Sequence, residues 1–302
     1  MKLFDLHCDT LYRAYMEKSM LFNDDFHISF NKSGYIEKYI QCLAVWIPDE
    51  YRGENAEKLF SGCVSKLHEQ IKDTDIIQCK TGADFEKVKK TGVVLTVESG
   101  AALGGKLENI RKYADMGVKM MTLTWNGTNE LGDGVGVENA GGLSEFGRKA
   151  VKELEKNKII LDISHASEKL FYDVAEIAES PLVASHSNAK KLCSHRRNLT
   201  DEQFEIIRKS GGMVGLNFCI DFLNDKAEKS SMNDVLRMAE YFLSQGGEKC
   251  IAMGGDFDGA DVPKDLNGIE KMADLYEMFL KYYSESVVED IFFNNAFAFF
   301  SR

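Results

Sequence analysis

The sequence predicts an α/β fold in which eight parallel strands and their helices close into a (β/α)8 barrel. Eight short β-rich runs recur along the 302 residues. Most of these runs are nearly continuous in apolar character, which is typical of parallel strands covered on both faces. Amphipathic or capped stretches separate them, as expected of helices. The alternation of eight strands with helices favours the barrel, although a doubly wound open sheet would use the same alternation.

The predicted strands are runs of four to eight residues rich in Val, Ile, Leu and Met. In order, they are residues 2–6, 40–47, 92–97, 119–124, 159–164, 182–185, 212–218 and 250–255. The clearest helices expected between them are residues 55–72, 143–157, 167–179, 200–211 and 232–247.

Start and stop signals support these helices. Thr200 and Gln203 have the spacing of a capping box, in which each residue caps the other's backbone N–H. Ser144 and Ser167 are placed as helix caps, and Gly211 stands where a helix should end.

The chain is expected to form one barrel domain over residues 1–302, because α/β barrels of this length are usually single domains. We find no internal repeats, low-complexity tracts or Pro-rich linkers. Residues 17–34 are polar and poorly periodic, so we expect an excursion after the first strand. Residues 285–300 are expected to form a final helix that packs on the barrel.

The overall charge restricts the class of partner. Lys and Arg total 37 against 48 Asp and Glu, which gives a net charge of −11. This charge opposes attraction to nucleic acid phosphates or to anionic lipid, so neither is an expected partner. A small-molecule partner fits better, and the oligomeric state stays open, with a homodimer as one option.

The location is expected to be cytoplasmic. The amino-terminal stretch lacks an apolar signal-peptide region, and no run of eighteen apolar residues occurs. The seven cysteines have no paired spacing, and several lie inside apolar runs, so they resemble reduced core residues.

The first candidate site follows the first strand, in the run DLHCDT. Because side chains alternate across a strand, Asp5, His7 and Asp9 should share one face. An imidazole and a carboxylate at a strand end are suitable ligands for a divalent metal. A short H-x-D pattern equally fits a buried histidine paired with a carboxylate. Cys8 should point to the other face and act as a packed thiol.

Further metal-type and acid-type residues fall at the ends of the other predicted strands. The whole set is His7, Asp9, Glu98, His165, His186 and Asp256. In a barrel, all carboxyl ends of the strands meet on the face that carries active sites, so these residues should converge. Three His, one Asp and one Glu are too few for two separate tetrahedral zinc sites. They suit two metals that share a carboxylate and a water.

Several motifs together resemble the membrane dipeptidase (renal dipeptidase) family, the M19 peptidases. They are DLHCDT, VESG, LTWNGTNELGDG, DISHAS, SHSNAKKLCSHRRNLTDEQ and GGDFDG, and they extend from Leu3 to about Gly259. The resemblance implies a metal-dependent hydrolase of the TIM-barrel type. Its expected function is hydrolysis of dipeptides by a metal-bridging hydroxide, with two Zn²⁺ per chain.

The resemblance also implies roles for individual residues. His7 and Asp9 would hold one zinc, His165 and His186 the other, and Glu98 would bridge them. Asp256 matches the catalytic acid/base, with Asp258 as its rival. Arg197 matches the residue that receives the substrate carboxylate, with Arg196 as its rival.

One position departs from the family pattern. Better-known members have LTH after the fourth strand, whereas this chain has LTW, which places Trp125 there. Trp has neither an acceptor nor a titratable ring, so it cannot replace an imidazole. Carbonyl polarisation would then depend on the metals or on a donor such as Asn126 or Asn129. Trp125 itself fits either a wall of the substrate pocket or a packing residue at the barrel rim.

Two other functions stay open at this point. The barrel and its two metals could hydrolyse another amide or a lactam. The chain could also be a metal-bound scaffold without catalytic activity, although Asp256 and Arg197 beside a full ligand set argue against that function.

Overall fold

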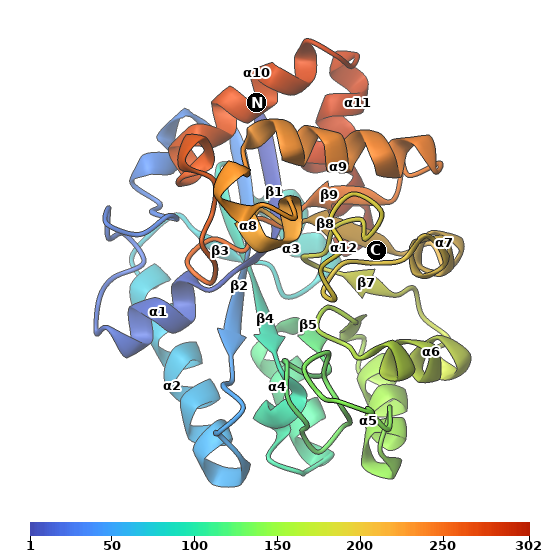
Figure 1. The fold of residues 1–302 in the computed structure, drawn as a ribbon. Coiled ribbons are helices and arrows are strands. Elements are labelled where there is room, and N and C mark those ends of the chain that lie inside the picture. Colours follow the sequence, from blue (N-terminus) through green and yellow to red (C-terminus); the bar gives the residue numbers. More distant parts are fainter.

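In a computed structural model that describes all 302 residues, eight parallel strands form a closed barrel with helices around it (Figure 1). The barrel strands are β1 (Lys2–Cys8), β2 (Lys38–Trp46), β4 (Thr91–Glu98), β5 (Val118–Thr122), β6 (Ile160–Asp162), β7 (Val183–Ala184), β8 (Met213–Leu216) and β9 (Ile251–Met253). The ring closes because β1 pairs with both β2 and β9, and β2 pairs with β4. The predicted TIM barrel is therefore confirmed, and the open-sheet alternative is wrong.

A ninth strand, β3 (Ile77–Gln78), lies outside this ring. It pairs with the start of β4 at Gly92 and Val93, whereas β5 pairs with the later part of β4. Two residues are too short to give a periodic signal, so the sequence did not predict this strand.

Twelve α-helices accompany the strands. They are α1 (Thr10–Met16), α2 (Gly53–Ile71), α3 (Gly82–Lys87), α4 (Glu108–Met116), α5 (Glu145–Lys156), α6 (Glu168–Ile177), α7 (Asp201–Lys209), α8 (Ile220–Leu223), α9 (Met232–Ser244), α10 (Met272–Leu280), α11 (Glu285–Glu289) and α12 (Asn295–Phe300). The five predicted helices correspond to α2, α5, α6, α7 and α9. Thr200 and Gln203 form the predicted capping box of α7, and the Ser144 and Ser167 hydroxyls cap α5 and α6.

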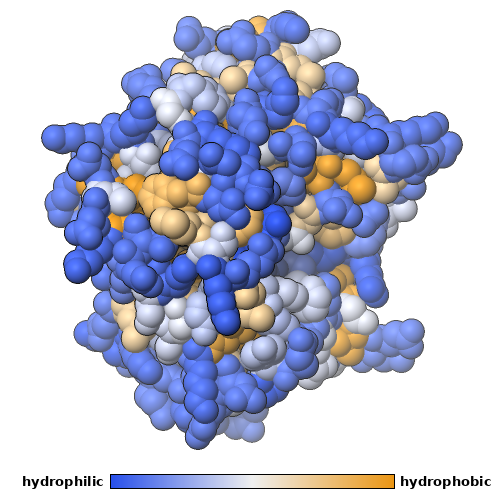
Figure 2. All heavy atoms as spheres, turned by 90° about the vertical axis from the view of Figure 1, so that its left-hand side faces the viewer, coloured by the Kyte–Doolittle hydropathy of each residue, from blue (hydrophilic) through white to orange (hydrophobic).

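Residues 17–34 form an excursion beside the barrel, with only the start of a 3-10 turn at Lys32–Tyr35. Its apolar side chains Phe26 and Ile28 are buried in the main core. The surface on this side of the molecule, near α1 and α2, is mostly hydrophilic with small hydrophobic patches (Figure 2).

The carboxyl-terminal helix closes the amino end of the barrel. It runs from Glu285 to Phe300 with a π turn at Asp290–Asn294. Phe293 and Phe300 join a buried cluster with Phe4 and other side chains from the strands, and the rings of Phe4 and Phe300 lie 5.2 Å apart. Burial of each such ring contributes about 2 kcal/mol to stability. The carboxyl end of the barrel is left for the functional site.

None of the helices combines the length and the apolar content needed to span a bilayer. All seven cysteines are buried as free thiols. The cytoplasmic location and the oligomeric state stay predictions.

Candidate active site

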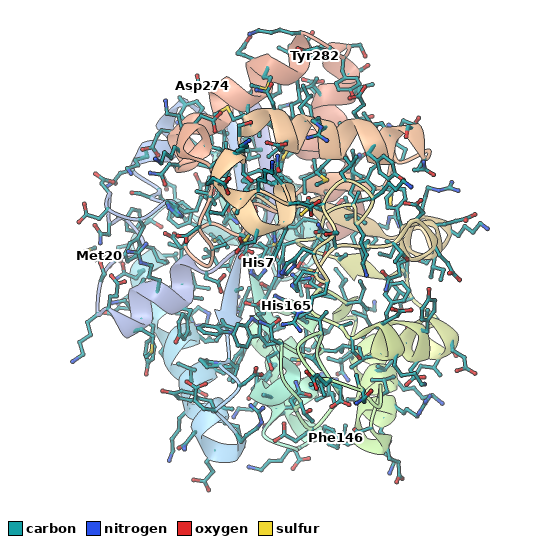
Figure 3. The ribbon with its side chains drawn as sticks, in the orientation of Figure 1. His7, Met20, Phe146, His165, Asp274 and Tyr282 are labelled. Atoms are coloured by element: carbon teal, nitrogen blue, oxygen red, sulfur yellow. The ribbon has the colours of Figure 1, made fainter.

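The six polar residues predicted at strand ends meet at the carboxyl end of the barrel. Figure 3 shows His7 and His165 near each other in the middle of the molecule, although they are far apart in the sequence. All six residues are buried, and they come from the ends of β1, β4, β6, β7 and β9. The fold therefore brings together side chains that are up to about 250 positions apart in the sequence.

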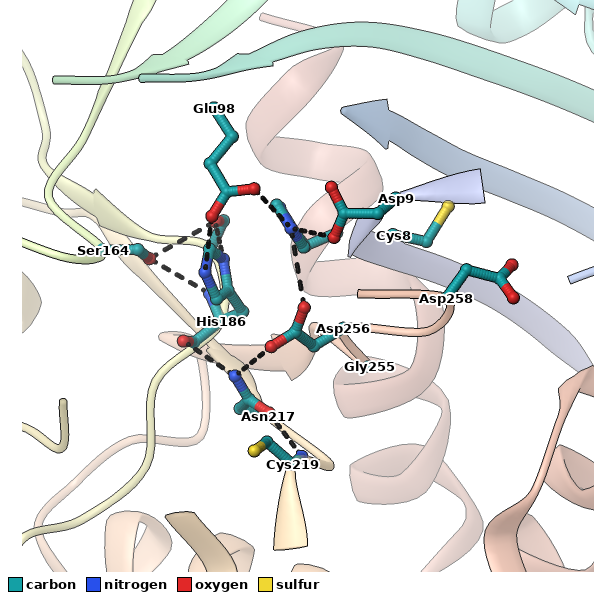
Figure 4. A network of polar contacts seen from close by, with 12 residues as sticks. Cys8, Asp9, Glu98, Ser164, His186, Asn217, Cys219, Gly255, Asp256 and Asp258 are labelled. Atoms are coloured by element: carbon teal, nitrogen blue, oxygen red, sulfur yellow. Dashed lines mark hydrogen bonds and ion pairs between the residues drawn. The ribbon is translucent and has the colours of Figure 1, made fainter. Parts of the chain in front are cut away.

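The carboxylate of Glu98 faces two groups of residues (Figure 4). Its Oε2 atom lies 3.6 Å from His7 Nε2. Its Oε1 atom lies 2.9 Å from His165 Nε2 and 3.7 Å from His186 Nε2. Each carboxylate oxygen can thus serve a different metal, which is the geometry of a bridging ligand.

The first group contains His7 and two further carboxylates. His7 Nε2 lies 3.3 Å from Asp9 Oδ2 and 3.8 Å from Asp256 Oδ1. Asp9 Oδ1 is buried without a hydrogen-bond partner. Burial alone would lower the pKa of His7, but Asp9 and Glu98 raise this pKa to about 10. Burial and the charge of Asp9 raise the pKa of Glu98 well above its usual value. So much negative charge around one imidazole suits a divalent cation.

The predicted common face of Asp5, His7 and Asp9 is only partly correct. The register of β1 shifts between Asp5 and Cys8, so strict alternation ends there. Asp5 accepts hydrogen bonds from the backbone N–H groups of His7 and Gly255, at 2.9 and 3.0 Å. Only His7 and Asp9 therefore reach the cluster, while Cys8 is a buried thiol beside the carbonyl of Cys42.

The second group contains the two histidines His165 and His186, whose Nε2 atoms lie 3.0 Å apart. His165 Nδ1 faces Asn126 Oδ1 at 2.9 Å, so Nδ1 carries the ring hydrogen. His186 Nδ1 faces Ser185 Oγ at 2.7 Å. The Ser185 hydroxyl donates to Asp162 Oδ2 at 2.5 Å and is left to accept from His186. Both Nε2 atoms are then lone-pair acceptors.

These acceptors are suited to hold a cation between them. Burial holds the pKa of both His165 and His186 well below its usual value, so the rings are neutral. Two imidazole lone pairs converge on Glu98 Oε1, an arrangement that is satisfied by a bound cation or, without one, by a proton on Glu98, whose pKa is raised. Neutral imidazole and carboxylate are also the ligand types that zinc prefers.

Asp162 supports the second group from behind. It accepts hydrogen bonds from the backbone N–H groups of Ser164 and Ser185, at 2.9 and 3.0 Å, and from Thr122 Oγ1 at 2.7 Å. The sequence indicated Asp162 and Ser164 as residues that could orient a ligand histidine. The sequence analysis missed Ser185, whose hydroxyl contacts Nδ1 of His186. The only signal in the sequence was that Ser185 directly precedes this histidine.

Strained backbone conformations occur at the same strand ends. His165 and Asp256 have φ values of 63° and 57°, in the left-handed region that non-glycine residues rarely adopt. Such strain is typical of functional sites, where the surrounding structure holds a side chain in a required direction.

Asp256 has the environment of a proton acceptor. Its Oδ2 accepts a hydrogen bond from Asn217 Nδ2 at 3.0 Å, while Oδ1 faces His7. Burial raises the pKa of Asp256, and the charge of Asp9 acts in the same direction. The sequence did not predict the contact with Asn217.

The rival residue Asp258 has a structural role. Its carboxylate accepts hydrogen bonds from Arg13 Nη1 at 3.0 Å, Thr10 Oγ1 at 2.5 Å and the backbone N–H groups of His27 and Ile28. These contacts attach α1 and the 17–34 excursion to the end of β9. All these contacts lie away from the residues around Glu98.

A cavity of about 560 Å³ opens above the cluster. Trp125 lines it, with its ring 4.9 Å from that of Trp46 and 6.0 Å from that of His165. Trp125 is thus both a cavity wall and a packing residue, so the two predicted roles coexist. Asn126 also lines the cavity.

The predicted role of Asn129 in substrate binding does not agree with its placement. Asn129 is buried, and its Nδ2 donates to Leu123 O at 2.8 Å and Ser99 Oγ at 3.2 Å. Its Oδ1 accepts from the Leu131 N–H at 2.8 Å. The amide is fully used within the protein and does not line the cavity.

Arg197 lies behind His186 rather than on the cavity wall. Its Nη2 donates to His186 O at 3.1 Å, and its Nε is buried without a partner. The neighbouring Arg196 is exposed on another surface. The positive charge of Arg197 is therefore close to the cluster but screened from the solvent.

The sequence profile of the family described as membrane dipeptidase (peptidase family M19) matches residues 1–302. The chain belongs to this family. It is therefore a peptide-bond hydrolase of the metallo-dipeptidase class, as the resemblance predicted.

Two solved structures agree with this membership. A metallo-peptidase from Rhodobacter sphaeroides, liganded with a phosphinate mimic of the dipeptide L-Ala-D-Ala, is 26% identical with a TM-score of 0.91, over 100% of this chain and 99% of that one. The structure of dipeptidase AC, a metallo-peptidase of family M19, is 27% identical with a TM-score of 0.90, over 100% and 98% of the two chains.

Among curated proteins, the "uncharacterized protein in pqqA 5'region" from Klebsiella pneumoniae is 36% identical over 203 residues, or 63% of this chain and 75% of that protein. Alignments with relatives from Acinetobacter calcoaceticus and Schizosaccharomyces pombe span 54% and 52% of their lengths.

Proposed function

We propose that this protein is a zinc-dependent dipeptidase that holds two zinc ions per chain. The observation that carries the proposal is the position of Glu98, whose two oxygens face two separate groups of ligands. His7 and Asp9 would hold one ion with Oε2, and His165 and His186 the other with Oε1. When bound, the two ions supply an activated water near neutral pH and polarise the scissile carbonyl.

Asp256 would move the proton during hydrolysis. Asn217 holds one oxygen of Asp256, which leaves the other oxygen directed toward His7 and the reaction centre. A carboxylate with a raised pKa can take a proton from the attacking water and deliver it to the departing amine. Its burial keeps bulk water from competing for that proton.

The cavity suits a small substrate. A volume of about 560 Å³ lies in the range of small-molecule pockets and is enough for two amino acid residues. The Rhodobacter sphaeroides relative binds a dipeptide mimic, which supports the same substrate class here. Arg197 would attract the free carboxylate of the substrate through its buried positive charge.

Metal analysis followed by a dipeptide library with free and blocked termini tests this function. We expect about two zinc ions per chain, and turnover that requires both. Glu98→Gln should lose metal and activity, whereas the matched control Glu86→Gln, on an exposed turn of α3, should keep both. Turnover of lactams or other amides but not dipeptides would favour the amidohydrolase alternative. No turnover by metal-loaded protein would favour the scaffold alternative.

A further inference from the structure

The cavity above the cluster has one aromatic side. Trp46, the last residue of β2, and Trp125, which follows β5, pack edge to face with ring centroids 4.9 Å apart. Tyr12 of α1 packs on Trp46 in the same way at 4.9 Å. All three rings line the cavity, so this side offers apolar and π surface to a substrate.

The opposite side of the cavity is acidic. Asp221 and Asp261, which follow β8 and β9, also line the cavity. In the closed ring, β9 is separated from β5 by three strands in either direction, so the loops that carry Asp261 and Trp125 leave the barrel at opposite points of its rim. The two acidic loops are joined by a hydrogen bond of 2.9 Å from the Ile220 N–H to Asp261 O.

These two carboxylates are not neutralised by the protein. Asp221 and Asp261 are exposed, and their side chains form no hydrogen bond or ion pair. Arg13 is the only Lys or Arg among the lining residues, and its guanidinium already contacts Asp258 at 3.0 Å and Glu17 at 2.9 Å. The cavity mouth therefore carries uncompensated negative charge on the side of β8 and β9.

From this asymmetry we propose that the cavity selects dipeptides that combine a cationic residue, Lys or Arg, with an apolar one. Asp221 and Asp261 are the specificity-determining residues for the cationic side chain. This inference rests on the proposed dipeptidase function. A substrate whose peptide bond lies at the metal cluster directs one side chain toward the acidic loops and the other toward the tryptophans. An acidic side chain directed toward Asp221 and Asp261 is repelled by their carboxylates.

The substrates that test this inference differ only in charge. Lys-Ala is compared with norleucine-Ala, and Ala-Lys with Ala-norleucine, each beside its Glu counterpart. At one of the two positions we expect kcat/KM to be up to about tenfold higher for Lys than for norleucine, since exposed ion pairs each contribute a few-fold. The ratio should fall at about 0.5 M NaCl, because salt screens exposed charges.

Variants assign the effect to its source. Asp221→Asn combined with Asp261→Asn should bring the Lys-to-norleucine ratio toward one. The matched control Glu86→Gln removes the same charge near the other end of the barrel, where its neighbour Phe85 packs against Phe4, and should keep the wild-type ratio.

Hydrolysis of norleucine dipeptides without any preference for Lys would overturn this inference alone. A ratio that persists in the double variant would overturn the assignment to Asp221 and Asp261. Failure to hydrolyse any dipeptide would overturn the proposed function and this inference together.

Discussion

The Nε2 atoms of His165 and His186 lie 3.0 Å apart, and both face the same oxygen of Glu98. Their Nδ1 atoms are committed to Asn126 and Ser185, so the Nε2 atoms cannot donate a hydrogen bond to each other. The fold thus holds two negative partial charges, the Nε2 lone pairs, close together. The Nδ1 contacts with Asn126 and Ser185 keep the two rings in this orientation. A bound cation would convert this unfavourable cluster into a stabilising one.

This geometry predicts the metal content of a double variant. His165→Ala with His186→Ala should bind about one zinc per chain instead of two, because the His7 side of Glu98 keeps its ligands. Elemental analysis of purified protein measures the ratio. His68→Ala, which removes an exposed histidine of α2, is the control and should bind two. A wild-type ratio near zero after purification with zinc would contradict the two-metal proposal.

Metal uptake should release protons. In the metal-free protein, the pKa of His7 is raised from 6.5 to about 10 by its carboxylate neighbours, so the ring is protonated at pH 7. Zinc must displace this proton. The apparent affinity of the protein for zinc should therefore rise with pH until about pH 10. Calorimetric titrations in buffers of different ionisation enthalpy measure the proton count.

The same pKa shift affects the metal-free fold. A raised histidine pKa contributes stability that is complete below pH 6.5 and is lost as the pH rises through about 10. NMR of histidine-labelled metal-free protein checks the assignment. A His7 ring that titrates near pH 6.5 would show that the carboxylates do not hold its proton.

Asp256 and Asp258 should respond differently to the same substitution. Asp256→Asn should lower kcat about 10²- to 10⁴-fold and keep both metals, because a general acid–base group is lost. Asp258→Asn should lower the free energy of unfolding by about 1–3 kcal/mol, because it breaks the charged contact with Arg13. Steady-state kinetics and thermal unfolding separate the two effects. If Asp258→Asn were the variant with the large loss of kcat, our assignment of the base would be wrong.

The sequence predicted which polar side chains meet at the mouth of the barrel because their convergence depends on one general property of the fold. Parallel strands in a barrel all end on the same face, so polar residues at strand ends must converge. His7, Glu98 and His186 could be assigned without knowing any contact between them. The strand ends themselves were visible because fully buried strands read as apolar runs.

Other features depend on contacts between distant segments, which a single sequence does not show. Asp258 hydrogen-bonds the backbone of His27, 231 positions away, and Asn217 reaches Asp256 across two loops. Asn126 and Asn129 lie in one loop without periodicity, so the sequence could not tell which of them faces the cavity. The register shift in β1 removed Asp5 from the face that strict alternation had given it.

Trp125 should influence substrate choice more than metal content. Trp125→Ala removes one wall of the cavity and the edge-to-face contact with Trp46, but no metal ligand. We expect relative kcat/KM values across a dipeptide panel to change severalfold, most for apolar side chains, while zinc content stays near two. Trp125→Phe keeps an aromatic wall and should change them less. Unchanged relative rates in Trp125→Ala would show that the residue only packs.

The last prediction concerns the free carboxylate that distinguishes a dipeptide from a longer peptide. Arg197 is buried beside His186 with an unpartnered Nε, and the charges of Asp256 and Glu98 oppose the lowering of its pKa by burial. Arg197 does not line the cavity, so it would act on the substrate carboxylate through its charge rather than through a hydrogen bond, and wild-type protein should cleave amidated dipeptides about tenfold more slowly. Arg197→Met should slow the cleavage of free-acid dipeptides by a similar factor and reduce the difference in rate between free-acid and amidated dipeptides.

Arg196→Met, which removes an exposed neighbouring charge, is the control and should leave that difference in rate unchanged. Zinc content is measured in each variant, because a loss of metal in Arg197→Met would indicate a structural role through His186. Equal cleavage of acids and amides by the wild type would show that Arg197 does not recognise the carboxylate.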